Sequence, residues 1–264
     1  MRYPEDFVNK IICGNSLEVM KSIPTGSIDL VLTDPPYRIS STVKIRRQRN
    51  PMKFGKVYKY QGKDISFEFG EWDIFPTLKD YLKFSKAWFH EAIRVLKKGG
   101  HIISFWDKHK LTYIVRWAEK LNVKPRQPLF WLKSNPVPCA RKVNFMSGVE
   151  LAFWGTKETT ARKFATFNYQ LGQHPDYFMH SIVGHTTYKD GGRSHPCQKP
   201  ISFGEWVILY LSNKGDIILD PFCGSGAFCV AAKGLNRKYI GIDSKKKYTE
   251  ITERRLNNAM ENLF

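Results

Sequence analysis

The sequence contains few cysteines, and they follow no pattern typical of a disulfide framework or a metal site. Five cysteines occur among 264 residues, and no two of them form a C-x-x-C pair. Domains that depend on disulfides are dense in cysteine, and zinc sites place their ligands at short, regular spacings. His174, His180, His185 and Cys197 occur in one region, but their spacing matches no ligand pattern. We therefore expect reduced thiols and no metal site.

Long apolar segments are also absent. No run of about 18 apolar residues occurs, and the first residues, MRYPED, lack the apolar core of a signal peptide. The sequence predicts a soluble cytoplasmic protein that does not enter a membrane.

Acidic residues are scarce relative to basic ones. The chain holds 42 Lys and Arg against 24 Asp and Glu, a formal net charge of +18. A field of this sign attracts polyanions. Nucleic acid is therefore the favoured partner, and an anionic membrane surface is the second candidate.

Short apolar runs alternate with segments of helical periodicity, which predicts an α/β fold. The runs expected to form strands are residues 10–13, 28–33, 101–106, 127–132, 149–154, 216–219 and 239–242. The segments expected to form helices are residues 78–96, 110–121, 201–211, 226–235 and 246–263. This order is typical of a mostly parallel seven-stranded sheet with helices on both faces. After the helix at 78–96, the cations and glycines of Lys97-Lys98-Gly99-Gly100 predict a C-terminal cap.

Two polar stretches interrupt the alternation, and we expect them to be insertions in a single domain that spans residues 1–264. The first is residues 38–70, whose part from 38 to 63 holds nine basic residues, no acid and three aromatic residues. The second is residues 156–195, which mixes histidine, tyrosine and basic residues. Loops carried on a fixed scaffold often contact substrate. For the first stretch, an ordinary solvated charge run is the alternative.

Near the C-terminus, the sequence DIILDPFCGSGA predicts a strand that runs into a glycine turn and a helix. Such a turn lets the backbone approach a ligand, and an acid that ends the next strand can bind ribose hydroxyls. Asp243 lies 19 positions after Gly224 and fits that acid. Gly224 and Gly226 alone are more typical of an ordinary tight turn. Asp220, placed to pair with a cationic amino group, and Phe222, placed to wall an adenine or methionyl pocket, favour together with Asp243 a cofactor of nucleotide type.

A second predicted strand, at residues 28–33, ends in Asp34-Pro35-Pro36-Tyr37. The prolines fix the backbone and lack an N–H, which leaves carbonyls to accept hydrogen bonds. An exocyclic amino group has two N–H donors: one can reach the Asp34 carboxylate and the other the Pro35 carbonyl, while Tyr37 stacks on the base. A proline turn with a capping aspartate explains the tetrapeptide alone equally well.

Together the two motifs resemble those of the amino-group DNA methyltransferases. Asp34-Pro-Pro-Tyr37 is similar to the catalytic motif of that family, and Asp220-Pro-Phe-Cys-Gly-Ser-Gly226 to its cofactor motif. Their order resembles the beta class, in which the target-recognition region lies between the motifs; residues 156–195 match that place. The resemblance covers most of the chain. It implies a Rossmann-like S-adenosylmethionine-dependent methyltransferase fold with a circularly permuted motif order.

The resemblance also implies which residues bind the cofactor. Segments similar to the family's recurring ones are Gly14-Asn15-Ser16-Leu-Glu18, Trp72-Asp73, Arg94-Val-Leu-Lys-Lys-Gly-Gly100, Trp131-Leu-Lys-Ser-Asn-Pro136 and His195-Pro-Cys-Gln-Lys199-Pro200. The residues expected to bind S-adenosylmethionine are Asn15, Ser16, Asp34, Lys199, Asp220, Phe222, Gly224, Gly226 and Asp243. The chain departs from the family at Cys197 and Ala227, where Thr is usual, and at Asn15, where Asp is frequent.

The activity implied is site-specific methylation of N6 of adenine in DNA, by base flipping and direct transfer. N4 methylation of cytosine is the alternative, although members with that activity more often begin the catalytic motif with Ser than with Asp. RNA or protein-glutamine methylation and non-catalytic nucleic-acid binding are more distant alternatives. A glutamine enzyme is expected to carry Asn in place of Asp34, and the intact Tyr37, Asp220 and Asp243 argue against a degenerate scaffold.

The expected partner is double-stranded DNA. Basic residues beside the catalytic motif and after a central strand are expected to contact it: Arg38, Lys44, Arg46, Arg47, Arg49 and Lys133. The family also allows a homodimer and a cognate restriction endonuclease in a restriction-modification system.

Overall fold

The structure is a computed structural model that describes residues 1–38, 44–45, 65–66, 73–137, 144–158, 165–183 and 198–261. The chain forms two compact units. The larger unit comprises Met1–Pro35 and Lys83–Phe264, and the smaller comprises Pro36–Leu82. The boundary therefore falls inside the predicted catalytic motif, between Pro35 and Pro36. In the smaller unit, β3 (Lys44–Ile45) pairs with β4 (Ile65–Ser66) in antiparallel orientation.

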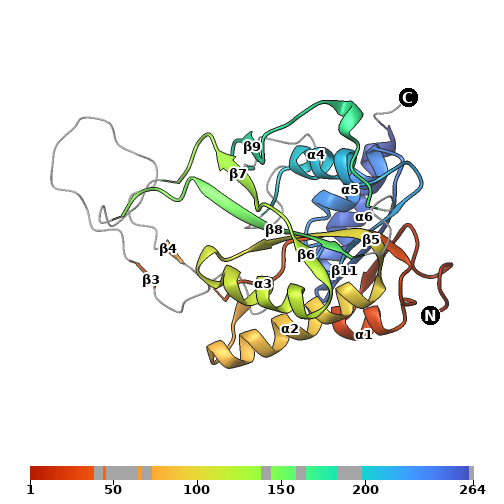
Figure 1. Ribbon diagram of the computed structural model, residues 1–264, viewed down its shortest axis with the longest axis horizontal. Helices are drawn as coiled ribbons and strands as arrows, with labels where there is room; N and C mark the ends of the chain where they lie inside the picture. Colours follow the sequence, from red (N-terminus) through yellow and green to blue (C-terminus); the bar gives the residue numbers. More distant parts are fainter. Residues whose placement is uncertain are drawn as a thin grey trace. The chain divides into compact units, whose positions relative to one another are not determined.

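A mixed nine-stranded sheet forms the larger unit (Figure 1). Its order is β1 (Lys10–Cys13), β11 (Lys238–Asp243), β10 (Ile217–Asp220), β2 (Ile28–Thr33), β5 (Leu96–Trp106), β8 (Val149–Lys157), β7 (Leu129–Lys133) and β9 (Tyr177–His180), and β6 (Val123–Pro125) also pairs with β8. From β1 to β5 neighbouring strands are parallel. β8 is antiparallel to β5, β6 and β7, and β9 is parallel to β7.

All seven predicted strands occur, which confirms the α/β fold class. β1 and β2 have the predicted bounds. The structure adds the short strands β6 and β9, so the sheet has nine strands in the described part of the chain where seven were expected. β6 has three residues, of which Lys124 is exposed, and β9 contains no fully buried residue, so neither forms the buried apolar run that marks the predicted strands.

Helices cover both faces of the sheet. They are α1 (Ser16–Lys21), α2 (Leu78–Val95), α3 (Leu111–Lys120), α4 (Ile201–Leu211), α5 (Ala227–Gly234) and α6 (Lys246–Glu261), with single 3-10 turns at Lys108–Lys110 and Tyr169–Leu171. Figure 1 shows α3 and the part of α2 from Lys83 onward on one face and α4 and α5 on the other. Trp88 and Phe89 of α2 are fully buried in the main apolar cluster. In the described residues no helix is long and apolar enough to cross a membrane.

The predicted cap after α2 is wrong. Lys97-Lys98-Gly99-Gly100 belongs to β5, which begins at Leu96. Its pairing with β2 shifts register there, Gly99 has φ +79°, and a Cβ on Gly100 would lie 2.8 Å from the Asp29 carbonyl oxygen. The glycines thus serve an irregular strand pairing. A distant residue binds the helix end instead, because Lys157 Nζ donates to the carbonyls of Ile93 and Leu96, at 2.7 Å each.

The strand order reverses between β10 and β2. From β10 the chain passes through α5 to β11 on one side, and from β2 it passes through α2 to β5 on the other. In open α/β sheets, ligands bind at the carboxyl ends of the strands beside such a reversal. Asp220 ends β10 and Asp34 follows β2, so both predicted motifs reach this point.

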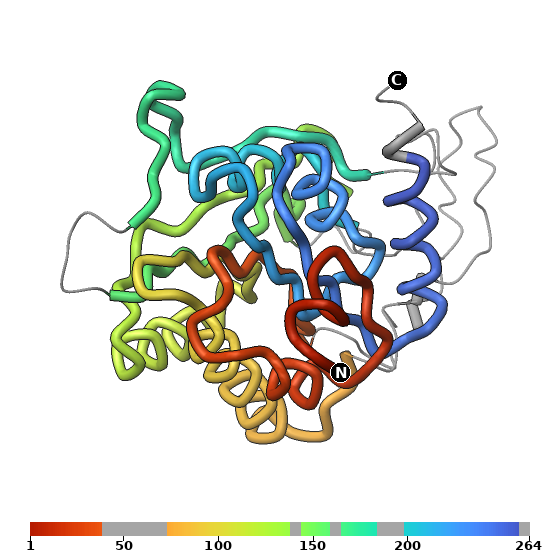
Figure 2. Tube along the Cα trace, turned by 90° about the vertical axis from the view of Figure 1, so that its right-hand side faces the viewer, coloured from red at the N-terminus to blue at the C-terminus, as the bar shows by residue number. Residues whose placement is uncertain are grey.

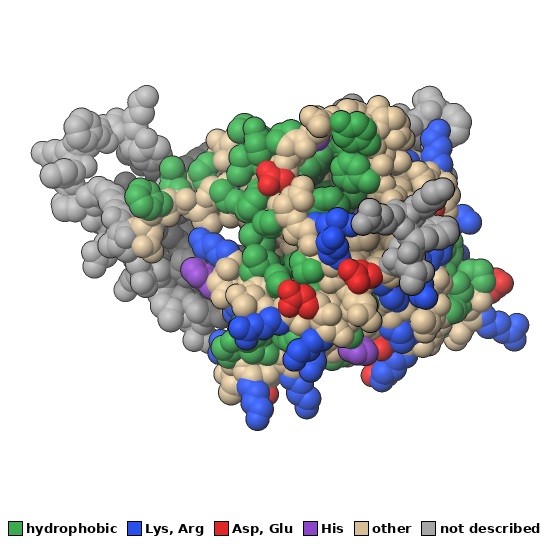
Figure 3. All heavy atoms as spheres, viewed as in Figure 1, with side chains coloured by type: hydrophobic (Ala, Val, Ile, Leu, Met, Phe, Trp, Pro, Cys, Tyr) green, Lys and Arg blue, Asp and Glu red, His purple; other side chains and the backbone are tan. Residues whose placement is uncertain are grey.

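Positive charge also covers described surface. Figure 3 shows Lys and Arg side chains along the lower border of one face, in the region of α2 and α3. Exposed cations of these two helices include Lys86 of α2 and Arg116 and Lys120 of α3. The net charge is therefore not confined to the basic stretch at 38–63.

Candidate functional site

Asp220 is a buried carboxyl group at the strand reversal. It is 3% exposed, and its Oδ1 accepts hydrogen bonds from Thr33 Oγ1 at 2.7 Å and from the Phe222 N–H at 3.1 Å. Burial raises the pKa of Asp220 to about 7, although both hydrogen bonds oppose the shift. Such a group gains from a cationic partner, which would compensate for its desolvation.

Asp243 ends β11, the next strand, and holds the glycine turn. Its Oδ2 accepts from the Gly224 N–H at 3.0 Å and its Oδ1 from the Lys245 N–H at 2.8 Å. Burial raises the pKa of Asp243 above its usual value. Each carboxylate oxygen has two lone pairs. The side chain can therefore hold the turn and also accept from ligand hydroxyls.

The glycine turn is fixed from behind by α6. Thr252 Oγ1 donates to the Gly224 carbonyl at 2.9 Å, and Arg255 Nη1 donates to the Ser225 carbonyl at 2.5 Å. Gly224 and Gly226 have φ values of +51° and +76°, which favour glycine. A Cβ on Gly226 would meet Thr252. Helix packing therefore requires this glycine, a reason that the sequence pattern did not reveal.

The segment after β1 contacts the turn through one side chain. Ser16 Oγ donates a short hydrogen bond to the Pro221 carbonyl. Asn15 is exposed and caps α1, because its Oδ1 accepts from the N–H groups of Leu17 and Glu18 at 2.9 and 3.4 Å. Of these two predicted cofactor residues, Ser16 contacts the turn. The described side-chain hydrogen bonds of Asn15 are made to its own helix.

Phe222 forms an aromatic wall with residues of α2. Its ring packs edge to face against Trp88, with centroids 5.4 Å apart, and against Phe84, at 5.9 Å. The ring is only partly buried. Trp88 is fully buried behind it, so the wall is held in place.

Lys199 joins the catalytic motif to a carboxylate that the sequence analysis did not single out. The Lys199 side chain is 4% exposed, and its Nζ forms ion pairs with Asp34 Oδ2 and, at 3.2 Å, with Glu150 Oε2. Lys133 Nζ pairs with Glu150 Oε1 at 2.7 Å, and the Lys133 side chain is 13% exposed. The structure thus gives Lys133, predicted to contact DNA, an intramolecular partner.

The positive charges of Lys199 and Lys133 outweigh the effect of burial on the pKa of Glu150. Burial opposes ionisation of the carboxyl, but Lys199 and then Lys133 lower the pKa of Glu150 below its usual value. Lys199 Nζ also lies 4.9 Å from the centroid of the Phe105 ring, within range of a cation–π contact. Glu150 is therefore held as a carboxylate between the side chains of Lys199 and Lys133.

In the smaller unit, Asp73 holds the backbone that follows Pro36. Its Oδ1 accepts from the N–H groups of Tyr37 at 2.8 Å and Arg38 at 2.6 Å, and Asp73 is 1% exposed. Arg38 has φ +57°, and its Nε donates to the Phe75 carbonyl at 3.1 Å. The sequence analysis gave Asp73 only a family match, since a residue 36 positions away carries no local signal of this contact.

The side chains of several predicted residues lie outside the described part of the chain. Lys44 is described only through its strand, and Arg46, Arg47, Arg49, His185 and Cys197 lie outside the described residues. Among the residues that are described, no three His, Cys, Asp or Glu side chains form a potential metal site.

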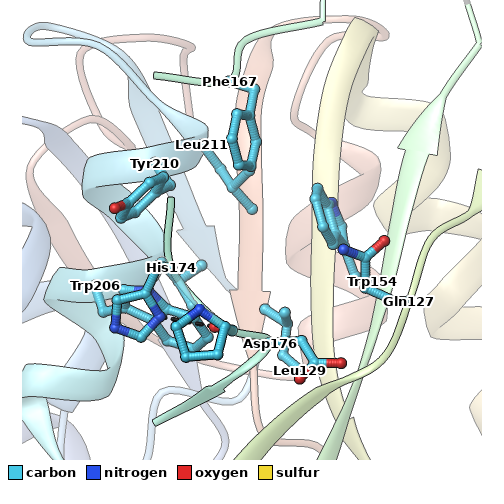
Figure 4. Close-up of a pocket in the computed structure, with 11 residues that line it drawn as sticks. Gln127, Leu129, Trp154, Phe167, His174, Asp176, Trp206, Tyr210 and Leu211 are labelled. Atoms are coloured by element: carbon cyan, nitrogen blue, oxygen red, sulfur yellow. Dashed lines mark hydrogen bonds between the residues drawn. The ribbon is translucent and has the colours of Figure 1, made fainter. Parts of the chain in front are cut away.

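A hollow lies between α4 and strands β7 and β8 (Figure 4). It encloses about 410 Å³, part of it open to solvent, and is lined by Gln127, Leu129, Trp154, Phe167, His174, Pro175, Asp176, Trp206, Val207, Tyr210 and Leu211. Figure 4 shows Trp206 and Tyr210 on the α4 side and Trp154 on the strand side. No residue of the two predicted motifs lines it.

Comparison with known proteins gives consistent matches. The model of the N6/N4 family, described as DNA methylase, matches residues 28–254. The Type II methyltransferase M.HinfI of Haemophilus influenzae is 33% identical over 270 residues, covering 97% of this chain and 70% of that protein. The Type II methyltransferase M2.LlaDCHI of Lactococcus lactis subsp. cremoris is 30% identical over 256 residues, covering 94% of this chain and 89% of that protein.

Solved structures share the fold. The crystal structure of an M1.HpyAVI–SAM complex matches with a TM-score of 0.69 and 22% identity, covering 94% of this chain and 98% of the other. The cytosine-N4-specific PvuII DNA methyltransferase matches with a TM-score of 0.70 and 16% identity, covering 95% and 89%. These likenesses confirm the predicted methyltransferase fold.

Proposed function

Because this chain belongs to the N6/N4 DNA methylase family, we propose that it transfers a methyl group from S-adenosylmethionine to N6 of adenine in DNA. The observation that carries the proposal is the set of three aspartates at the carboxyl ends of adjacent strands. Asp34 follows β2, Asp220 ends β10 and Asp243 ends β11, around the point where strand order reverses.

The chemistry of these residues fits the cofactor. S-adenosylmethionine carries a sulfonium and an α-ammonium group, and buried carboxylates such as Asp220 favour cations. Its ribose hydroxyls are donors, and Asp243 retains acceptor capacity beyond its two backbone bonds. The Phe222 wall offers an apolar surface to the adenine. When bound, the cofactor supplies the methyl group.

The residues of the catalytic motif act on the target base. The Asp34 carboxylate and the Pro35 carbonyl each accept a hydrogen bond from one N–H of the target amino group. These hydrogen bonds make the amino nitrogen more nucleophilic. Tyr37 stacks on the base once it has left the duplex, and this offsets part of an extrusion cost of about a few kcal/mol. Holding base and cofactor in line is worth roughly 7–11 kcal/mol in favourable cases.

The DNA itself is bound by positive charge. We assign phosphate contacts to the basic stretch 38–63 within the insertion 38–70, and target recognition to the insertion 156–195. Arg38 and Lys133 stay proposed contacts, and both have described intramolecular partners.

The second candidate is N4 methylation of cytosine, because the family contains enzymes of both kinds and one solved relative is titled cytosine-N4-specific. The Asp at position 34, rather than Ser, favours adenine. Both curated relatives are named Type II methyltransferases. This supports a type II modification enzyme, with a restriction endonuclease and a second copy of the chain as further proposed partners.

The test is nucleoside mass spectrometry of DNA methylated by the purified protein, with Asp34→Ala as the matched variant. We expect N6-methyladenine from the wild type and none from Asp34→Ala, while calorimetry shows cofactor binding by both. N4-methylcytosine alone would reverse the base assignment. No methylated base on any DNA, from a protein that binds the cofactor, would overturn the proposal.

A further inference from the structure

We propose that Glu150 is a positioning residue for methyl transfer, because it holds the Lys199 ammonium group on the Asp34 carboxylate. This inference rests on the proposed function and extends it to a residue outside both sequence motifs. Glu150 itself is not proposed to touch the base or the cofactor; it acts through Lys199.

The contacts form one continuous line of opposite charges. Lys133 pairs with one carboxylate oxygen of Glu150, Lys199 pairs with the other, and Lys199 also pairs with Asp34. Both oxygens of Glu150 are thus engaged by cations. The orientation of its carboxylate is fixed by two side chains from different elements.

Sheet topology explains how Glu150 reaches the site. β8 is antiparallel to β5, and Leu151 pairs with Trp106, the last residue of β5. The first residues of β8 therefore lie at the edge where the parallel strands β2 and β5 end. Lys133, the last residue of β7, reaches the same edge because β7 is antiparallel to β8.

Burial makes the second carboxylate necessary. The Lys199 side chain is 4% exposed and lies over the Phe105 ring. A buried ammonium is costly unless it is paired and hydrogen-bonded. With Glu150 present, Lys199 shares its charge between two carboxylates. Without Glu150, one of the two carboxylates that hold the ammonium is lost, so Lys199 is held on Asp34 less firmly and the Asp34 carboxylate is less fixed in its orientation toward the target amino group.

The same arrangement keeps Lys199 charged. Two neighbouring carboxylates favour the protonated amine, and loss of one would release the proton at lower pH. A role of Glu150 in folding alone would not change the pH range of methyl transfer. This difference separates positioning from simple structural support.

The first test compares Glu150→Gln with Glu119→Gln. Glu119 is exposed in α3 and belongs to no assigned site, so it controls for loss of one negative charge. Single-turnover methylation should slow on the order of tenfold in Glu150→Gln, and the alkaline limb of its pH profile should move to lower pH. Cofactor affinity in Glu150→Gln and the rate of Glu119→Gln should stay at wild-type values. Glu150→Asp, which keeps the charge, should recover part of the rate.

A second test asks whether Glu150 acts through Lys199. In a double-mutant cycle, Glu150→Gln should add little to the loss caused by Lys199→Met, because residues that act as one unit are not additive. A readout without turnover is the ¹⁵N resonance of the Lys199 ammonium, which should titrate at lower pH in Glu150→Gln.

Two results would overturn the inference while leaving the proposed function intact. One is a wild-type rate and pH profile in folded Glu150→Gln, and the other is additive loss in the cycle with an unchanged Lys199 resonance. If Glu150→Gln does not fold, the same comparison is made with Glu150→Asp, where an unchanged rate and resonance argue against positioning. Absence of methylation by the wild type would instead contradict the proposed function. In that case the ¹⁵N resonance of Lys199 still tests whether Glu150 and Lys199 are paired.

Discussion

Gly226 lies directly against Thr252: a Cβ added to the glycine would come within 2.2 Å of the Thr252 Cγ2 atom. Gly226→Ala therefore combines a steric clash with a left-handed backbone, which alone costs about 1–2 kcal/mol for an L-residue. We expect lower stability in denaturant unfolding and weaker cofactor binding, because the turn carries the Gly224 N–H held by Asp243.

Thr252→Ala in the same protein removes the two nearest clashing atoms, Cγ2 and Oγ1, and leaves the Thr252 Cβ at 2.9 Å. We expect it to restore part of the stability lost in Gly226→Ala, although alone it costs about 1 kcal/mol through the lost bond to Gly224. Additive losses in the double variant would mean that the helix contact does not limit this position.

Asp73→Ala should lower the rate of methylation. The carboxylate accepts both backbone N–H groups after Pro36, and a buried donor left without a partner costs about 1–3 kcal/mol. The expected effect is a lower kcat, since Tyr37 loses its fixed backbone. Asp80→Ala, an exposed carboxylate in the same unit, is the control. Equal kcat values for the two variants would contradict the prediction.

Asp220 should make the unliganded protein less stable as pH rises from about 4 to about 7. Its usual pKa is 3.8, and burial raises the pKa to about 7, so the folded state binds a proton that the unfolded state lacks in this range. Stability then falls by up to about 1.4 kcal/mol per pH unit. Asp220→Asn should remove this contribution, so the slope of stability against pH, measured by urea unfolding at several pH values, should become more positive. An unchanged slope would exclude a raised pKa at this position.

His101 should have the opposite effect. Burial lowers the pKa of His101 from 6.5 to about 4, so the unfolded state binds the extra proton between these values and stability rises with pH. His101→Gln should remove this contribution, so that stability falls with pH in this range. In the wild type the two groups therefore offset each other between about pH 4 and 6.5, and each single variant should expose the slope of the other.

Neutralising Arg46, Arg47 and Arg49 to Gln should weaken DNA binding and leave cofactor affinity unchanged. Each phosphate contact adds about 0.9 to the slope of log affinity against log salt, so the slope should flatten by up to about 2–3 units. Fluorescence anisotropy across a salt series measures both quantities. If affinity and slope match the wild type, the basic stretch is a solvated loop.

Local patterns predicted most of the secondary structure. The bounds of β1, β2 and α4 matched the expectation because apolar periodicity is read from neighbouring residues. α1 was not predicted, since six residues hold too few periods and only the Asn15 cap marks its start. The supposed cap at Lys97–Gly100 failed because the carbonyls of α2 are bound by Lys157, which is more than 60 positions away in the sequence.

The candidate site shows the same limit. Asp34, Asp220 and Asp243 follow strands whose parallel order could be expected, so their meeting at one edge was predictable. Glu150 was not, because its position depends on β8 running antiparallel, which no local pattern encodes. A glutamate inside the apolar run VELAFW was the one available signal.

The pairing of β1 with β11 has a consequence for the order of folding. Lys10 of β1 pairs with Ile240 of β11, so β1 finds its neighbour only after roughly 230 further residues have been synthesised; Figure 2 shows the red N-terminal segment beside the blue C-terminal part of the chain. At about 5–20 residues per second, that strand waits on the order of 10–50 seconds during synthesis. The central strands β2 and β5 can pair long before, and the half of the sheet that carries the glycine turn is completed last.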